Sequence, residues 1–270
     1  MAEANRYTKI IEKIFLSGYK KGSRKVQFDR TDIERVAEEL GITLPKNLGD
    51  VIYSFRYRVP LPKTIQRRAP KGEEWIIRSA GRSKYCFVAT KVAKIEPAKR
   101  MAETKAPDAT PGVISMYALN DEHALLAKLR YNRLVDIFTR VTCYPLQSHL
   151  RTSVPSLGQV ETDEIYIGVD RYRAHYVFPV QAKGKTDRLN IVQIEQDVAM
   201  CKHKFLALIC RPIAAQFMPD QLIVLFEFED GKDGAVITSE KHYHPVPPEE
   251  IDEDDLAAYR KRNMDNGNLR

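Results

Sequence analysis

The sequence lacks the features of a membrane-spanning, secreted or zinc-finger protein. Its four cysteines stand far apart with no Cys-x-x-Cys pair, so neither a zinc finger nor a disulfide framework is expected, and a reducing cytoplasm is the expected location. The longest apolar runs, Phe205–Cys210 and Leu222–Phe226, are too short to span a bilayer, so no membrane partner is expected. The first ten residues contain no apolar signal segment. Glycine and proline number only 13 and 15, which excludes a fibrous or low-complexity chain.

The chain is instead typical of a globular protein with an uneven charge. Its 270 residues, 43% of them hydrophobic, suffice for one large domain or two ordinary ones. Residues 1–115 contain 24 Lys and Arg against 13 Asp and Glu, a balance of +11, whereas the remainder has a balance of −4. This asymmetry predicts a polyanion-binding module joined to a second unit; a lysine-rich solvated surface is the alternative.

The basic region, residues 1–92, has the pattern of a winged-helix domain. Apolar spacing predicts helices over 6–16 and about 47–55, and a capping-box pattern at Thr31–Glu34 predicts a helix between them. Two short β-like runs, Glu74–Arg78 and Tyr85–Thr90, flank a turn and predict a hairpin. Helix, helix–turn–helix and basic hairpin is the order of a winged helix, whose basic side chains would contact DNA phosphates and base edges. The candidate DNA-binding residues are Arg56, Arg58, Lys63, Arg67, Arg68, Arg82 and Lys84.

The rest of the chain predicts an α/β fold with a mixed sheet flanked by helices. Residues 93–114, rich in Lys, Ala and Pro, are predicted to be a linker, followed by a core over 115–270 with an acidic C-terminal tail. The tail's acidic cluster, residues 249–255, is interpreted as a solvated surface or a helix start. The predicted core elements are a helix at 121–139, strands at 148–153, 159–169 and 175–181, a helix at 189–204, and strands at 205–211 and 222–229.

Acidic, amide and lysine side chains gather at one end of the predicted hairpin. Gln181 and Lys183, two residues apart at the end of a buried strand, point to the same side, and Asp163 belongs to the neighbouring strand. A buried lysine beside acids is costly unless the acids pair with it or hold a metal. Phosphodiester hydrolysis needs a hard cation held by oxygens, which Asp163, Gln181 and the Ala182 carbonyl can supply, and a charge to stabilise the phosphate, which Lys183 can supply. Glu122, on the preceding helix, is a candidate outer carboxylate.

This constellation resembles the PD-(D/E)xK nuclease superfamily, the fold of many type II restriction endonucleases. The resemblance covers about residues 115–230 and implies Mg²⁺ as cofactor. It aligns the family's first acid with Asp163, or with Glu164 as an alternative metal ligand, and its triplet with Gln181–Lys183. The dipeptide before the hairpin is Thr-Asp rather than Pro-Asp, and the middle acid is a glutamine. Which acid completes the metal charge, Glu122, Glu161 or Glu164, is left open.

The expected function is therefore a Mg²⁺-dependent endonuclease that cuts double-stranded DNA, restriction-like and homodimeric because cutting both strands needs two sites. One alternative is a DNA-binding regulator or adaptor with an inactive nuclease-like core. Others are a nonspecific nuclease of repair or defence, and a generic α/β domain in which Asp163 and Lys183 form an ordinary ion pair. A partner methyltransferase cannot be inferred. His149 is interpreted as isolated, and His242 and His244 as surface residues.

Overall fold

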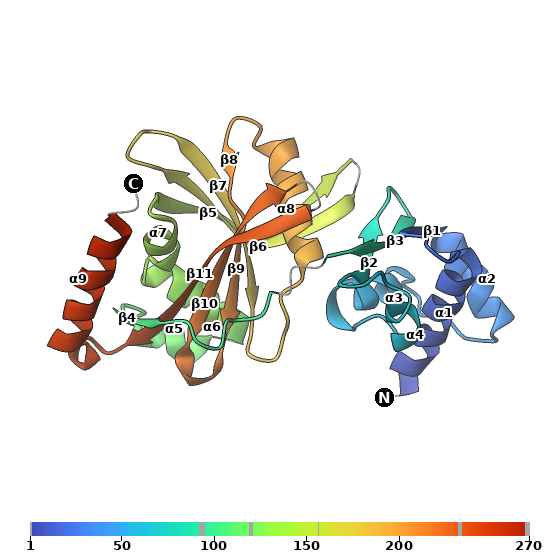
Figure 1. Ribbon diagram of the computed structural model, residues 1–270, viewed down its shortest axis with the longest axis horizontal. Coiled ribbons are helices and arrows are strands. Elements are labelled where there is room, and N and C mark those ends of the chain that lie inside the picture. The colour runs from blue at the N-terminus through green and yellow to red at the C-terminus, as the bar shows by residue number, and fades with distance from the viewer. Residues whose placement is uncertain (1, 92–94, 119–120, 156, 232–233, 268–270) are drawn as a thin grey trace.

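A computed structural model describes residues 2–91, 95–118, 121–155, 157–231 and 234–267, and its two bodies lie side by side (Figure 1). The smaller body, here the N-terminal module (residues 2–91), has a three-stranded antiparallel sheet in the order β1-β3-β2. Its elements in chain order are α1 (Ala2–Gly18), β1 (Lys25–Asp29), α2 (Arg30–Glu39), α3 (Gly49–Tyr53), the π-helical turn η1 (Ser54–Arg58), α4 (Lys63–Gln66), β2 (Glu74–Ser79) and β3 (Lys84–Thr90).

The N-terminal module has a hydrophobic core of its own. Phe15 of α1 contacts Trp75 and Phe87 edge to face, with ring centroids 4.9 and 5.2 Å apart, and these rings are nearly inaccessible to solvent. The second helix begins earlier than its sequence pattern predicts. Asp29, not Thr31, is the N-cap, and a capping box joins it to Asp32, because β1 runs directly into the helix.

The larger body, here the C-terminal module (described residues from 95 to 267), is a mixed sheet with helices on both faces. The sheet has the order β4-β11-β10-β9-β7-β6-β5, with β8 also pairing with β7. The pairs β7–β8, β7–β9 and β4–β11 are parallel and the others antiparallel. Its elements are β4 (Glu103–Pro107), α5 (Gly112–Tyr117), α6 (Asp121–Tyr131), α7 (Leu134–Thr139), β5 (Thr142–Val154), β6 (Gly158–Val169), β7 (His175–Lys183), α8 (Ile191–Lys204), β8 (Ile209–Cys210), β9 (Ile213–Phe217), η2 (Pro219–Gln221), β10 (Ile223–Gly231), β11 (Gly234–Val246), η3 (Pro248–Glu250) and α9 (Glu253–Gly267).

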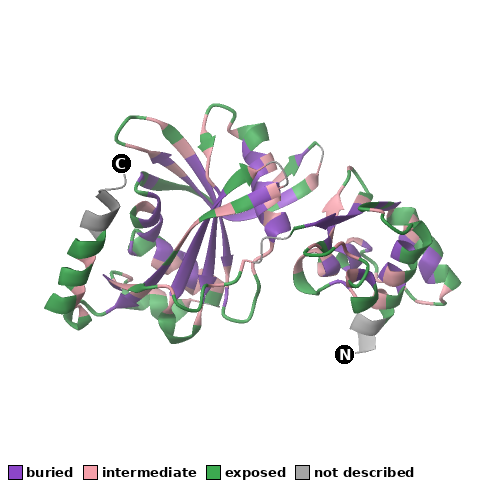
Figure 2. Cartoon of the chain, in the orientation of Figure 1, coloured by how far each residue is buried: buried purple, intermediate pink, exposed green. Residues whose placement is uncertain are grey.

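Strand β7 divides its side chains between the two faces of this sheet. Phe178, Val180 and Ala182 pack in the core under α6 and α7, while Val177 packs in a second core under α8. This alternation follows from the two-residue period of a strand. The strand is buried from Val177 to Ala182, as expected for a central strand, and Figure 2 shows the middle of the sheet as its most deeply buried part.

Several elements differ from the sequence-based expectation. Strand β4 lies inside the predicted linker 93–114 and pairs with β11, whereas residues 93 and 94 lie outside the described residues. The helix expected at 121–139 is two helices, because Arg133 between them adopts a left-handed conformation with φ of 52°. The strand expected at 205–211 is reduced to the two residues of β8. The acidic cluster is a helix start, since α9 begins within it.

Within the described residues, four hydrogen-bonded contacts tie the modules together, beside the apolar packing of Tyr57 and Ile76 on the C-terminal module. The Arg78 side chain donates to the Glu195 carboxylate of α8, with Nε 2.9 Å from Oε2. The remaining contacts are the Tyr57 hydroxyl donating to Gln196, the Asn190 amide donating to the Arg56 carbonyl, and the Ser79 hydroxyl donating to the Leu157 carbonyl. The N-terminal module therefore rests on α8 and on the turn between β5 and β6. Among the described helices, none has the length and apolar character needed to cross a membrane.

Candidate active site

Asp163 lies where the β6–β7 ladder ends. The paired register stops at Glu164 and Val180, and the next inward-facing N–H of β7, that of Ala182, donates to Asp163 Oδ2 at 2.8 Å. The Thr162 hydroxyl donates to Asp197 of α8, whereas the Glu164 carboxylate accepts from Arg130 of α6 on the opposite face of the sheet. Residues two apart on a regular strand would share one face. Strand β6 is therefore irregular at Asp163, and its carboxylate turns toward β7 rather than into either core.

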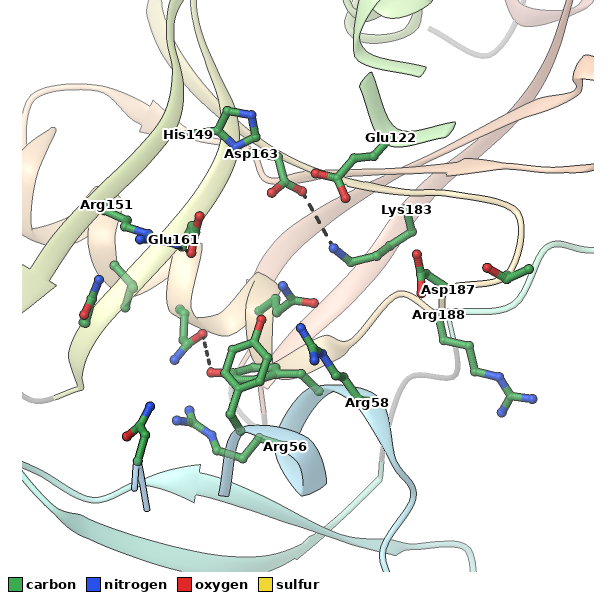
Figure 3. A pocket seen from close by; sticks show the side chains of 18 residues that line it. Arg56, Arg58, Glu122, His149, Arg151, Glu161, Asp163, Lys183, Asp187 and Arg188 are labelled. Atoms are coloured by element: carbon green, nitrogen blue, oxygen red, sulfur yellow. Dashed lines mark hydrogen bonds and ion pairs between the residues drawn. The ribbon is translucent and has the colours of Figure 1, made fainter. Parts of the chain in front are cut away.

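Lys183 faces Asp163 at the end of the β6–β7 pairing. Its Nζ lies 3.8 Å from Asp163 Oδ2, and the two side chains are only 16% and 11% exposed (Figure 3). The Ala182 N–H faces β6, and the carbonyl of a strand residue points to the same side, so the Ala182 carbonyl is directed to the β6 side of the strand as well. The pair expected from the hairpin is thus formed, with a backbone oxygen on the same side of the strand.

Glu122 approaches from the first turn of α6. Gly184 allows this approach, because a Cβ at Gly184 would lie 3.0 Å from the Asp121 Cβ. Burial raises the pKa of Glu122, and the Asp163 charge raises it further. Burial also raises the pKa of Asp163, opposed by Lys183 and by the Ala182 hydrogen bond. A cation between Glu122 and Asp163 would relieve this repulsion.

The Gln181 side chain is buried against α8 rather than directed at Asp163 and Lys183. Its amide nitrogen donates to Asp197 of α8 and to the Glu161 carbonyl, both at 3.0 Å, and its amide oxygen accepts from Gln193 at 3.2 Å. Burial raises the pKa of Asp197 to about 7, against hydrogen bonds from Thr162 and Gln181. In this arrangement Gln181 orients its neighbours, and serving as a metal ligand would require its oxygen to turn away from Gln193.

The two other acids considered for the metal occupy different positions. Glu164 is fully buried on the α6 side, where it pairs with Arg130 and accepts a hydrogen bond from the Tyr166 hydroxyl at 2.7 Å. It is directed away from Asp163, which differs from its expected role as an alternative ligand. Glu161 does line the pocket, but it is 43% exposed and pairs with Arg151 at 3.1 Å.

Asp163, Lys183, Glu122 and Glu161 lie in a pocket of about 920 Å³ that both modules line. Asp163, Lys183 and Glu122 come from the C-terminal module, and Figure 3 shows Arg56 and Arg58 of η1 on the opposite wall. The remaining candidate DNA-binding residues are outside the pocket and exposed on the N-terminal module; they are Lys63, Arg67, Arg68, Arg82 and Lys84.

Sequence reasoning missed several residues that line the pocket, among them His149, Arg151, Arg188, Tyr53 and Tyr57. His149 lies between Ser148 and Leu150, which pair with Glu164 and Thr162, so it sits beside Asp163, and its φ of 49° is unusual for a residue other than glycine. Arg151 and Arg188 also line the pocket. Only the strand register could have indicated His149. His242, expected at the surface, is buried beside Glu240 at 2.7 Å.

The donor set fits a hard divalent cation that keeps most of its water. No group of three or more His, Cys, Asp or Glu side chains suited to a metal is found among the described residues. Mg²⁺ needs no such group, since it is commonly held by one or two carboxylates together with substrate phosphate oxygens. Asp163, Glu122 and the Ala182 carbonyl are the residues that would hold it.

Comparisons of the chain with protein-family models, with curated proteins and with solved structures find no match.

Proposed function

We propose that this protein is a metal-dependent endonuclease that hydrolyses phosphodiester bonds of double-stranded DNA in the manner of type II restriction enzymes. The observation that carries the proposal is the meeting of Asp163 and Lys183 at one end of two neighbouring strands, recessed in a pocket and 3.8 Å apart. An ion pair that served stability alone would gain from closer contact and from further hydrogen bonds. This pair is loose and open to a cavity that can admit substrate.

The arrangement of the C-terminal module supports the resemblance to the PD-(D/E)xK superfamily. The acid and the Q-x-K triplet lie on antiparallel neighbours β6 and β7, the helix α8 follows the triplet, and Glu122 comes from the preceding helix α6. The two strands belong to a mixed sheet and the two helices cover its faces, which is the arrangement that this family's fold implies.

Each residue of the site has a chemical task in this proposal. Asp163, Glu122 and the Ala182 carbonyl would hold Mg²⁺, which would lower the pKa of a water molecule and polarise the phosphate. Lys183 places its ammonium against the charge that develops on the phosphate. Gln181 holds Gln193 and the backbone of Glu161 in position through its hydrogen bonds.

The N-terminal module supports a DNA-binding role. Its order of helix, strand, helical segments and hairpin around a three-stranded sheet resembles that of a winged helix, with the short helix α4 as an addition before the hairpin. Its exposed lysines and arginines would bind phosphates with an affinity that falls steeply with salt. A homodimer, with one site for each strand, remains part of the proposal.

The decisive experiment is digestion of supercoiled plasmid DNA with Mg²⁺, with EDTA as the negative condition. Lys183→Ala is expected to abolish cutting while gel-shift binding persists. Lys185→Ala is the matched control, because Lys185 follows two residues later, is exposed, and stacks on Phe217 outside the pocket. Cutting by Lys183→Ala at the parental rate would overturn the site assignment.

One observation favours a second candidate, a DNA-binding regulator or adaptor with an inactive core. Where the family has an acid, Gln181 supplies an amide whose donors and acceptor are already engaged by Asp197, Glu161 and Gln193. Such a protein would bind DNA and leave it intact under every metal condition. Discrete, reproducible fragments would separate the restriction-like enzyme from a nonspecific repair or defence nuclease.

A further inference from the structure

The proposed chemistry lies at the bottom of a pocket that only part of a nucleic acid can enter. The pocket volume, about 920 Å³, is within the range of about 300–1,000 Å³ typical of clefts that hold one compact ligand. A single turn of duplex DNA is ~34 Å long. Asp163 is only 8% exposed, so a phosphate must enter the pocket to reach it.

Residues of the N-terminal module close the pocket on the side opposite Asp163. The Tyr57 hydroxyl bonds Gln196 of α8, and the Asn190 amide bonds the Arg56 carbonyl, so η1 is held against the C-terminal module at both points. The Arg78–Glu195 pair strengthens the same contact. Because these contacts hold η1 across the pocket from Lys183, a single strand needs less room than a duplex to bring its backbone there.

The chemistry of the wall formed by η1 and its neighbours suits an unpaired strand. Tyr53 and Tyr57 line the pocket with ring centroids 4.8 Å apart, and Tyr53 is 45% exposed. The Arg56 guanidinium lies 4.9 Å from the centroid of the Tyr57 ring, and the Arg58 guanidinium lies 5.0 Å from that of the Tyr53 ring. Aromatic rings beside cations are how proteins bind single strands, because bases stack on the rings while phosphates pair with the cations.

Arg56 has hydrogen-bonding capacity that the described residues leave unused. Its Nε and Nη2 atoms are buried and have no hydrogen-bond partner among them. Arg58 and Arg188, which also line the pocket, have no carboxylate partner in the described part of the chain, whereas Arg151 is paired with Glu161. Buried guanidinium donors without a partner are costly, and a turn of the Arg56 side chain into the pocket that it lines would bring these donors to a phosphate oxygen.

We infer that this pocket binds a single unpaired DNA strand, with a base on Tyr53 and a phosphate on Arg56, so that the cut strand is unpaired at the cut position. The inference rests on the proposed nuclease function and narrows its substrate: duplex DNA is cut where it is locally open. The N-terminal module then forms part of the catalytic pocket in addition to its exposed basic surface.

The test compares three DNA substrates of one sequence with the full-length protein and Mg²⁺: a single strand, a fully paired linear duplex, and a duplex with an internal unpaired loop. The single strand and the looped duplex are expected to be cut at least tenfold faster than the paired duplex, with cuts inside the loop. Equal rates on the paired duplex would overturn the inference and leave the nuclease function standing.

Binding provides a readout that does not depend on cutting. Fluorescence anisotropy with Lys183→Ala in EDTA should show single-strand binding that depends on Tyr53, whatever affinity the exposed basic surface gives to the paired duplex. Tyr53→Ala should weaken single-strand binding about tenfold, whereas Tyr53→Phe keeps the ring and should bind as the parent does. Tyr172→Ala is the matched control, because Tyr172 is 75% exposed outside the pocket and carries Arg171 over its ring at 4.7 Å.

The outcomes separate the two proposals. Single-strand binding that depends on Tyr53, without any cutting, would support the inferred pocket and overturn the nuclease function. An unchanged single-strand affinity of Tyr53→Ala would overturn the inference whatever the cutting assay gives. Thermal melting of each variant confirms that it is folded.

Discussion

Asp163 and Glu164 are adjacent acids on one strand, yet they belong to two ionic clusters of opposite character. Glu164 is inaccessible to solvent, and both of its carboxylate oxygens are engaged, by Arg130 and by the Tyr166 hydroxyl. Asp163 has one backbone hydrogen bond, a lysine at 3.8 Å and a cavity in front of it. The Glu164 cluster is saturated, whereas the Asp163 cluster retains capacity for a ligand.

The difference teaches how to tell a structural ion pair from a candidate site. A buried charge is tolerated when its partners satisfy it completely, and removing one partner then costs stability. Burial and a neighbouring carboxylate raise the pKa of the Asp163 and Glu122 carboxyl groups. Keeping such a carboxylate ionised costs folding free energy, which is typical of a functional site. Helix α6 serves both clusters, with Glu122 in its first turn and Arg130 in its last.

The largest effect is expected from Asp163→Asn. DNA cutting should fall on the order of a thousandfold, which is ~4 kcal/mol in activation free energy, because an electrostatic group of the reaction is lost. The melting temperature should stay within about 2 °C of the parent, since the variant removes a poorly solvated charge. A variant that unfolds instead would assign Asp163 the same structural role as Glu164.

A substitution at the neighbouring acid, Glu164→Gln, should instead lower stability and leave DNA cutting in place. Its amide would replace one of the two acceptor oxygens, which now serve Arg130 and the Tyr166 hydroxyl, with a donor in a fully buried position, so the free energy of unfolding should fall by about 2 kcal/mol. Urea denaturation measures this loss, and the residual folded protein should still cut DNA in Mg²⁺. Loss of cutting at full stability would contradict the division between the two clusters.

A second ion pair whose partners are fully engaged, Asp108 with Lys128 of α6, should make the free energy of unfolding depend on pH in the acid range. Burial alone would raise the pKa of Asp108, but the Lys128 ammonium and hydrogen bonds from Thr110 and Asn132 outweigh it and hold the pKa at about 2. Because this pKa is below its unfolded value of 3.8, the stabilisation is complete above pH 4 and is lost as pH falls toward 2.

The size of this contribution is about 2 kcal/mol. Asp108→Asn should therefore be less stable than the parent at pH 6, and the difference should shrink between pH 4 and pH 2. Thermal unfolding followed at several pH values checks this. A difference that stays constant over that range would show that the carboxylate charge is not what stabilises the fold here.

The smallest effect is expected from Glu122→Gln. Cutting at limiting Mg²⁺ should fall about tenfold and recover as the Mg²⁺ concentration rises, because an outer carboxylate of the metal site is lost. Asp121→Asn is the matched control, since Asp121 shares the first turn of α6 but does not line the pocket. Equal loss in both variants would indicate an effect on the helix end rather than on the metal.

The hairpin with its acid and its Q-x-K triplet could be predicted from sequence because its signals are local. Strand-like apolar runs, among them the continuous run Tyr176–Val180, the polar turn at Asp170–Ala174 and the helical spacing after Asn190 indicate β6, β7 and α8 without any distant contact. The irregularity at Asp163 has no such signal. It depends on how β6 separates from β7 and on contacts with two helices on opposite faces.

Other elements were missed because their partners are distant in the chain. Strand β4 is formed from a proline-containing, lysine-rich segment and is stabilised by pairing with β11, more than 130 residues away. Strand β1 is short and lies in a glycine- and lysine-rich stretch, but pairs with β3. Such strands gain their hydrogen bonds only from tertiary structure, which overrides weak local preference.

The sequence by itself determined the α/β character, the separation of a basic from an acidic part, and the presence of an acid and a lysine on successive strands. Tertiary structure alone decided which acid faces the lysine, which acid is buried with an arginine, and that Arg56 and Arg58 face the same pocket. The physical reason is that residue type and period are encoded locally. The direction of a side chain at a strand end, and the packing of one module on another, depend on contacts between residues far apart in the chain.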